Sequence, residues 1–218
     1  MTWLADLGTR DYKEVWDLQK ELVQRRLSGE IQDVLILVEH PEVITLGKRG
    51  KPDDVFTSEI PVYTVERGGE ATYHGPGQLV CYPIFNLRHL GLTVRQYLHR
   101  LEEVIIGLLN RFDIQACRSP HMPGVWVNDA EISSIGIHVS HGMTMHGFTL
   151  NVSTNLRCFS YINVCGVPGK KITSIACISG KKPVVEDFVT PIIRSFEQVF
   201  DLDIQPGESA LISGCDDE

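Results

Sequence analysis

Three strand-like segments joined by two tight turns place the strongest constraint on the fold of this chain. Residues 125–127, 132–139 and 143–152 are rich in β-branched and alternating apolar side chains. Asn128-Asp129 separates the first two segments and Ser140-His141-Gly142 the last two, and hairpin turns favour these residue types. Strands joined so closely pair antiparallel, because parallel strands need long crossovers. The pattern therefore argues against a doubly wound nucleotide-binding sheet.

Helical periodicity flanks these hairpins. Residues 9–28 place apolar side chains near a 3.6-residue period and stop at Gly29. Thr93 begins a capping box, and helical spacing continues from there to Phe112. A last helix covers Phe188 to Phe200, with Pro191 either near its start or kinking it. Further strands are expected at residues 34–38, 43–46 and 79–85. The sequence predicts an α/β (α+β) fold with a mixed sheet flanked by helices.

Length and composition indicate one domain. The chain has 218 residues, of which 43% are hydrophobic, enough for a single domain over residues 1–218, with 207–218 as a loose acidic tail. No apolar run approaches the roughly 20 residues of a membrane span. Met1 to Asp6 lacks the features of a signal peptide, so we expect a cytoplasmic protein without a membrane partner. A net charge of −8 argues against nucleic-acid binding.

The six cysteines suggest neither a zinc site nor a redox dithiol, because no two form a Cys-x-x-Cys pair. Most are expected to be small buried hydrophobic residues, with Cys215 in the tail. The histidines show no metal-ligand spacing. The sequence therefore predicts no bound metal.

The segment from Arg67 to Gln78 is the leading candidate for ligand contact. Four glycines let its backbone approach a bound molecule closely, and Arg67 and His74 add directed hydrogen-bond donors. Its glycine spacing matches neither the Rossmann nor the Walker pattern. A tight turn between strands is the alternative interpretation.

Three other places are weaker candidates. Cys165 lies beside Gly166 and shortly before a pair of lysines, which would favour a reactive thiolate, although it is one cysteine among six. His146 precedes a glycine in a strand, where glycine often marks a close approach of ligand to backbone, but it is equally a satisfied half-buried histidine. The basic turn at residues 48–51 is either solvated or a landing site for an anionic substrate or carrier.

Together these segments resemble the lipoyl(octanoyl) transferase family over roughly residues 5–200. The signature Arg67-Gly68-Gly69-x-x-Thr72-x-His74-x-Pro76-Gly77-Gln78 carries most of the resemblance. It is supported by His146-Gly147-x-x-Leu150-Asn151 and by Cys165-Gly166 followed by Thr173-Ser174.

The resemblance implies the catalytic fold of biotin and lipoate protein ligases, and an acyl transfer with no metal or cofactor. Cys165 would accept an octanoyl group from octanoyl-acyl carrier protein as a thioester. A lysine on a lipoyl domain of a 2-oxoacid dehydrogenase E2 subunit, or on the glycine cleavage H protein, would then take it as an amide. Family substrate contacts fall on Arg67, Gly68, Gly69, Glu70, Ala71, Thr72, Tyr73, His74, Ser134, Ile135, Gly136, Gly147, Phe148 and Thr149.

One position departs from the family pattern. The family places a lysine that lowers the cysteine pKa where this chain has Glu131. A carboxylate beside Cys165 would oppose thiolate formation. We therefore expect slow turnover unless Lys171 or His146 substitutes, and a higher transfer rate after Glu131→Lys.

Two alternatives remain open from the sequence. An ATP-dependent lipoate or biotin ligase would share the fold but depends on a lysine in the region of Glu131. A non-catalytic binding protein for acyl carriers or lipoyl domains would explain Glu131 but not the retained Cys165.

Overall fold

An eight-stranded mixed sheet forms the centre of the computed structural model, which describes residues 1–163 and 170–207. Its strand order there is β11-β1-β2-β6-β10-β9-β8-β7; β1 pairs in parallel with β2 and β11, and the other neighbours are antiparallel. The elements are β1 (Thr2–Thr9), α1 (Tyr12–Leu27), β2 (Asp33–Glu39), β3 (Val43–Leu46), β4 (Val62–Thr64), β5 (Ala71–His74), β6 (Gln78–Ile84), α2 (Val94–Asn110), β7 (Cys117–Arg118), β8 (Gly124–Val127), β9 (Ala130–Ser140), β10 (Met143–Asn151), α3 (Ile175–Ser179), α4 (Glu186–Phe200) and β11 (Ile204–Pro206), with 3₁₀ turns at Pro52–Asp54 and Leu156–Tyr161.

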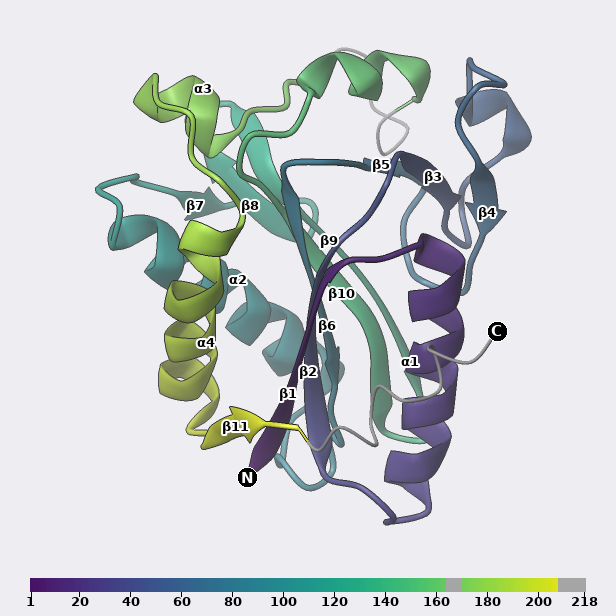
Figure 1. Ribbon diagram of the computed structural model, residues 1–218, viewed down its shortest axis with the longest axis vertical. Helices are drawn as coiled ribbons and strands as arrows, with labels where there is room; N and C mark the ends of the chain where they lie inside the picture. Colours follow the sequence, from purple (N-terminus) through teal and green to yellow (C-terminus); the bar gives the residue numbers. More distant parts are fainter. Residues whose placement is uncertain (164–169, 208–218) are drawn as a thin grey trace.

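Helices cover both faces of this sheet (Figure 1). α1 packs on one face, and α2 and α4 pack together on the other. Alternate residues of β2 divide between the two layers: Val34, Ile36 and Val38 lie in the cluster with α1, and Leu35 and Leu37 in the cluster with α2 and α4. Burial on both faces explains why this strand is a continuous apolar run. The predicted buried strand and the mixed α/β architecture are confirmed.

The helices and hairpins agree closely with the patterns that predicted them. Thr93 and Gln96 form the predicted capping box at the start of α2. Asn128 and His141 adopt φ of 54° in the two hairpin turns. Pro191 lies inside α4 rather than at its first residue. Across the described part of the chain, no helix is both long and apolar enough to pass through a membrane.

A second sheet of three strands, in the order β4-β3-β5, corrects one prediction. The segment from Arg67 to Gln78 is not wholly a loop, because Ala71–His74 forms β5 and pairs antiparallel with Val43–Leu46 of β3. The N-terminal strand β1 was also not predicted. Both strands find their partners far along the chain, so no local turn marks them. Of the predicted tail, residues 208–218 lie outside the described residues.

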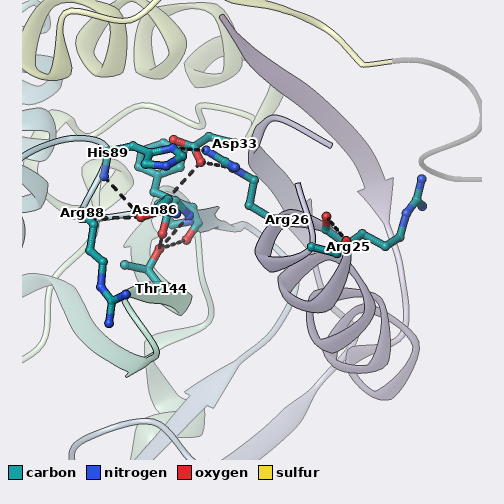
Figure 2. Close-up of polar contacts among 10 residues, drawn as sticks. Arg25, Arg26, Asp33, Asn86, Arg88, His89 and Thr144 are labelled. Atoms are coloured by element: carbon teal, nitrogen blue, oxygen red, sulfur yellow. Dashed lines mark hydrogen bonds and ion pairs between the residues drawn. The ribbon is translucent and has the colours of Figure 1, made fainter. Parts of the chain in front are cut away.

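A buried polar cluster fastens the C-terminal end of α1 to the large sheet (Figure 2). Arg26 Nε donates to Asp33 Oδ1 at 2.6 Å, and the backbone N–H of Asn86 donates to the same oxygen at 3.1 Å. Arg26 Nη2 lies 2.9 Å from His89 Nδ1. Since Asp33 has both a charged partner and a backbone donor, this cluster is a structural anchor.

The expectation of mostly buried cysteines holds for only half of those described. Cys81 and Cys158 are buried, whereas Cys117 and Cys177 are exposed. Cys165 and Cys215 lie outside the described residues.

Candidate functional site

A cavity lies where the small sheet meets strands β9 and β10 of the large one. Its empty space amounts to about 520 Å³ when the part open to solvent is included. Its wall comprises Arg67, Gly68, Gly69, Glu70, Ala71, Thr72, His74, Ser134, Ile135, Gly136, Gly147, Phe148 and Thr149, with Tyr12, Val80, Tyr82 and His146. The three segments that were predicted to contact substrate therefore meet around one space.

Tyr73 is the member of the predicted set that does not line this cavity. Its hydroxyl donates to Glu42 Oε1 at 2.9 Å, and its ring packs edge-on against Phe159 at 5.5 Å between centroids. Tyr73 therefore belongs to the core beneath the small sheet. Conversely, Tyr12, Val80 and Tyr82 line the cavity although the sequence did not point to them, because they come from elements predicted only as core.

Arg67 organises the segment that carries it. Its buried guanidinium donates to the backbone oxygens of Thr45 at 2.7 Å, Glu70 at 2.9 Å and Gly68 at 2.9 Å. The backbone N–H of Gly68 donates to Ile137 O in β9 at 2.9 Å, which ties the segment to the large sheet. These hydrogen bonds fix the shape of the cavity wall.

Two glycines are required by the packing of the protein itself. A Cβ at Gly147 would lie 2.1 Å from Cys81 O in β6, and a Cβ at Gly75 would lie 2.1 Å from the hydroxyl oxygen of Tyr73. Gly147 also lines the cavity, so its contact with a ligand stays a prediction. The glycine lets β10 lie against β6.

His74 is neutral in this setting. Complete burial is the largest cause that lowers its pKa well below the usual value, and the charges of His40 and Arg67 add to it. His74 Nδ1 donates to Gln78 Oε1 at 2.9 Å, because Gln78 Nε2 donates to Asn151 Oδ1 at 2.9 Å and so turns its oxygen toward the ring. His74 therefore holds the start of β6 in place and adds no positive charge to the cavity.

His146 lies at the cavity wall with a strained backbone. Its φ is 58°, its side chain is 2% exposed, and Nε2 lies 3.5 Å from Glu66 Oε2. Burial lowers the pKa of His146, against the opposing effect of Glu66. The residue is fully buried, not half-buried as expected, and its backbone N–H donates to Gln19 Oε1 at 2.9 Å.

Glu131 is buried in an ion pair with a lysine that sequence reasoning missed. Lys170 Nζ lies 2.9 Å from Glu131 Oε1, and Ser134 Oγ donates to Glu131 Oε2 at 2.7 Å. Burial raises the pKa of Glu131, while the Lys170 ammonium and the Ser134 hydroxyl act against that rise. The lysine proposed as a substitute, Lys171, instead pairs with Asp129 at the surface.

The pairing of the chain beside β9 decides which lysine is buried. Ile172 bridges Glu131 in parallel, the Glu131 N–H donates to Lys171 O at 2.9 Å, and the Thr173 N–H donates to Glu131 O at 2.8 Å. Neighbouring residues in an extended segment point to opposite sides. Two adjacent lysines were visible in the sequence, but the choice between them was not.

The structure says less about two other predicted features, the Cys165-Gly166 pair and the basic turn at residues 48–51. Cys165 and Gly166 lie outside the described residues. In the basic turn, Arg49 Nε lies 2.7 Å from Glu70 Oε1, while Lys48 and Lys51 are exposed.

Comparison with known proteins agrees with this architecture. Residues 11–197 match the family model of the lipoyl protein ligase A/B catalytic domain. A protein from Syntrophobacter fumaroxidans described as octanoyltransferase is 42% identical over 210 residues, covering 93% of this chain and 92% of that protein. Another octanoyltransferase, from Desulfotalea psychrophila, is 44% identical over 190 residues, covering 83% and 85%.

Solved structures resemble the fold at low identity. A lipoate-protein ligase A bound with ATP has a TM-score of 0.78 at 14% identity, covering 97% of this chain and 91% of that one. A bipartite lipoate protein ligase from Thermoplasma acidophilum, described with its E2 lipoyl domain, has a TM-score of 0.75 at 14% identity, covering 97% and 89%. A biotin protein ligase from Aquifex aeolicus has a TM-score of 0.59 at 13% identity, covering 91% and 70%. The predicted fold relationship is confirmed.

Proposed function

This chain belongs to the lipoyl protein ligase A/B catalytic-domain family, and on that basis we propose that it transfers an octanoyl group to a lysine of lipoyl domains. The observation that carries the proposal is the likeness to proteins described as octanoyltransferases, which align with nearly the whole chain. The solved ligases share the fold at much lower identity. A transferase is therefore better supported than a ligase.

The cavity suits a medium-length acyl chain. Val80, Ile135 and Phe148 supply apolar wall from three strands of one sheet. Burial of apolar surface contributes about 0.8 kcal/mol per methylene, so an eight-carbon chain has much to gain from this space. The fixed segment from Arg67 to His74 then forms a wall that need not reorganise when the chain enters.

The proposed chemistry uses Cys165 as nucleophile. Its sulfur attacks the carbonyl carbon of the octanoyl thioester; a new carbon–sulfur bond forms and the bond to the carrier breaks, releasing the carrier thiol. The amine of the target lysine next attacks the acyl-enzyme, forms an amide and releases the Cys165 thiol. Since a thioester is already activated, the transfer needs neither ATP nor a metal.

Octanoyl-acyl carrier protein is the proposed donor. Lipoyl domains of 2-oxoacid dehydrogenase E2 subunits and the glycine cleavage H protein are the proposed acceptors. The solved relative described with an E2 lipoyl domain supports the acceptor class. The exposed Lys48 and Lys51 suit an acidic donor protein.

A two-substrate assay tests the proposal. A purified lipoyl domain is incubated with the protein and either octanoyl-acyl carrier protein or free octanoate plus ATP, and its mass is measured. We expect octanoylation from the carrier alone. Modification only with ATP, together with ATP–pyrophosphate exchange, would identify a ligase. No modification from either donor, with retained binding of the carrier or the lipoyl domain, would identify a binding protein.

A further inference from the structure

The cavity between the two sheets has an open side and a closed end. Gly68 is exposed and Ser134 of β9 is half-buried, so the cavity opens where these residues line it. Tyr12 of α1, Tyr82 of β6 and His146 of β10 also line it, and each is at most 3% exposed. We call these three buried residues the end wall. A chain that enters beside Ser134 meets the end wall at its inner end.

The depth of the cavity matches an acyl chain of about eight carbons. Ile135 of β9, Phe148 of β10 and Cys81 of β6 pair in one row across the large sheet, and Tyr82 follows Cys81. Adjacent strands lie about 4.8 Å apart, so this row is about 10 Å wide. An extended chain of eight carbons has seven bonds of about 1.5 Å and projects to roughly 9 Å. A chain with two more carbons would press on the end wall.

Hydrogen bonds and ring contacts hold the end wall in place. Burial lowers the pKa of His40 to about 4, so its ring is neutral and carries one N–H. Nδ1 must donate to the carbonyl oxygen of Arg10 at 2.8 Å, and the Tyr82 hydroxyl therefore donates to Nε2 at 3.0 Å. The Tyr12 ring stacks on His74 at 5.7 Å and meets His40 edge-on at 5.2 Å. Neither tyrosine can yield to a longer chain without breaking these contacts.

His146 reaches the end wall because its backbone departs from strand geometry. Residues two apart in a strand point to the same side, and Phe148 stacks on Phe196 of α4. His146 instead meets Tyr82, on the α1 side, edge-on at 6.4 Å, and its Nε2 lies 3.5 Å from Glu66 Oε2. A left-handed φ of 58° makes this turn possible. Backbone strain of this kind costs free energy and clusters at sites that clamp a ligand.

We propose that His146, together with Tyr82, limits the acyl chain to about eight carbons. This inference rests on the proposed function and adds the residues that decide which chain length is accepted. The last carbons of an octanoyl chain lie against the two rings. A shorter chain leaves this space unfilled, and a longer one cannot enter fully while its thioester stays at the open side.

The experiment removes the His146 side chain without adding strain. Glycine adopts a left-handed φ readily, so His146→Gly is expected to fold, and His146→Asn is a second small variant that tolerates this conformation. His141→Gly is the matched control, since His141 has a φ of 54° but lies exposed in a hairpin turn away from the cavity.

Two measurements are made on each protein. The first is kcat/KM of transfer to a lipoyl domain from hexanoyl-, octanoyl-, decanoyl- and dodecanoyl-acyl carrier protein. The second is the unfolding temperature with each of the corresponding free fatty acids, which reports binding without any transfer.

The wild-type protein is expected to prefer octanoyl over decanoyl by about tenfold or more, the size expected for two methylenes that cannot be buried. In His146→Gly, the ratio of decanoyl to octanoyl transfer should rise about 15-fold, because each newly buried methylene contributes about fourfold. Decanoate should then stabilise this variant more than octanoate does, the reverse of the wild type. His141→Gly should keep the wild-type order in both measurements.

A wild-type protein that accepts dodecanoyl as readily as octanoyl overturns this inference whatever the variants do. A folded His146→Gly, or His146→Asn if the glycine variant does not fold, also overturns it when the decanoyl to octanoyl ratio stays within about threefold of the wild type, less than one methylene contributes. An equal change in His141→Gly does the same. If the wild type transfers no acyl group, the proposed function fails, while the unfolding temperatures with fatty acids still decide the chain-length limit.

Discussion

Replacing Glu131 with lysine should destabilise the fold, although sequence reasoning alone predicted that it would raise the transfer rate. The new ammonium would face Lys170 in a site where the present partners are 2.9 Å apart and almost fully buried. Breaking a buried pair costs about 3–5 kcal/mol, and the Ser134 hydroxyl would lose its acceptor at a further cost of about 1 kcal/mol. Because whole domains are stable by only about 5–15 kcal/mol, a large part of the stability would be lost.

Urea unfolding measures this effect directly. Asp129→Lys is the matched control, since it makes the same change of charge two residues earlier, where the pair with Lys171 is exposed. We expect a clearly lower midpoint for Glu131→Lys and an unchanged midpoint for Asp129→Lys. A Glu131→Lys protein that unfolds at the same urea concentration as the wild type would refute the reasoning about the buried pair.

Three further predictions concern packing, pH and docking. Gly147→Ala should lower the stability of the fold by about 1–3 kcal/mol, because the new Cβ would lie 2.1 Å from Cys81 O. Gly107→Ala has open space around the new Cβ and should stabilise α2 by about 0.5–1 kcal/mol. Thermal unfolding distinguishes the two variants. Burial lowers the pKa of His40 to about 4. As the pH falls, His40 therefore binds a proton in the unfolded chain before it does in the folded protein, and the free energy of unfolding should fall by roughly 3 kcal/mol between pH 6.5 and 4. An equal slope of stability against pH in His40→Asn would contradict this. Lys48→Glu with Lys51→Glu should weaken binding of octanoyl-acyl carrier protein and flatten its salt dependence, and unchanged affinity would leave these residues as a solvated turn.

Local sequence patterns predicted the helices and hairpins whose structure depends on residues close together in the chain. The capping box at Thr93 and the periodicity after it predicted α2, and the turn residues near Asn128 and His141 predicted the two hairpins. The same logic missed β1 and β5, whose partners lie far away along the chain. The small sheet, and with it the shape of the cavity, therefore had to come from the structure.

The candidate site was predictable in its segments but not in its side-chain directions. A specific signature located Arg67 to His74, and the structure adds that Arg67 binds its own loop while Tyr73 turns away. Lys171 was chosen over Lys170 because sequence cannot state which of two adjacent residues faces inward. The bridge between Glu131 and Ile172 decides that question.

The central claim is that Cys165 carries the octanoyl group between two proteins. Intact-mass analysis after mixing the protein with octanoyl-acyl carrier protein tests it most directly, with Cys165→Ser as the control. The account predicts one octanoyl adduct on the wild-type protein, its disappearance when a lipoyl domain is added, and no adduct on the variant. A wild-type protein without an adduct, or a variant that is acylated equally well, would contradict it.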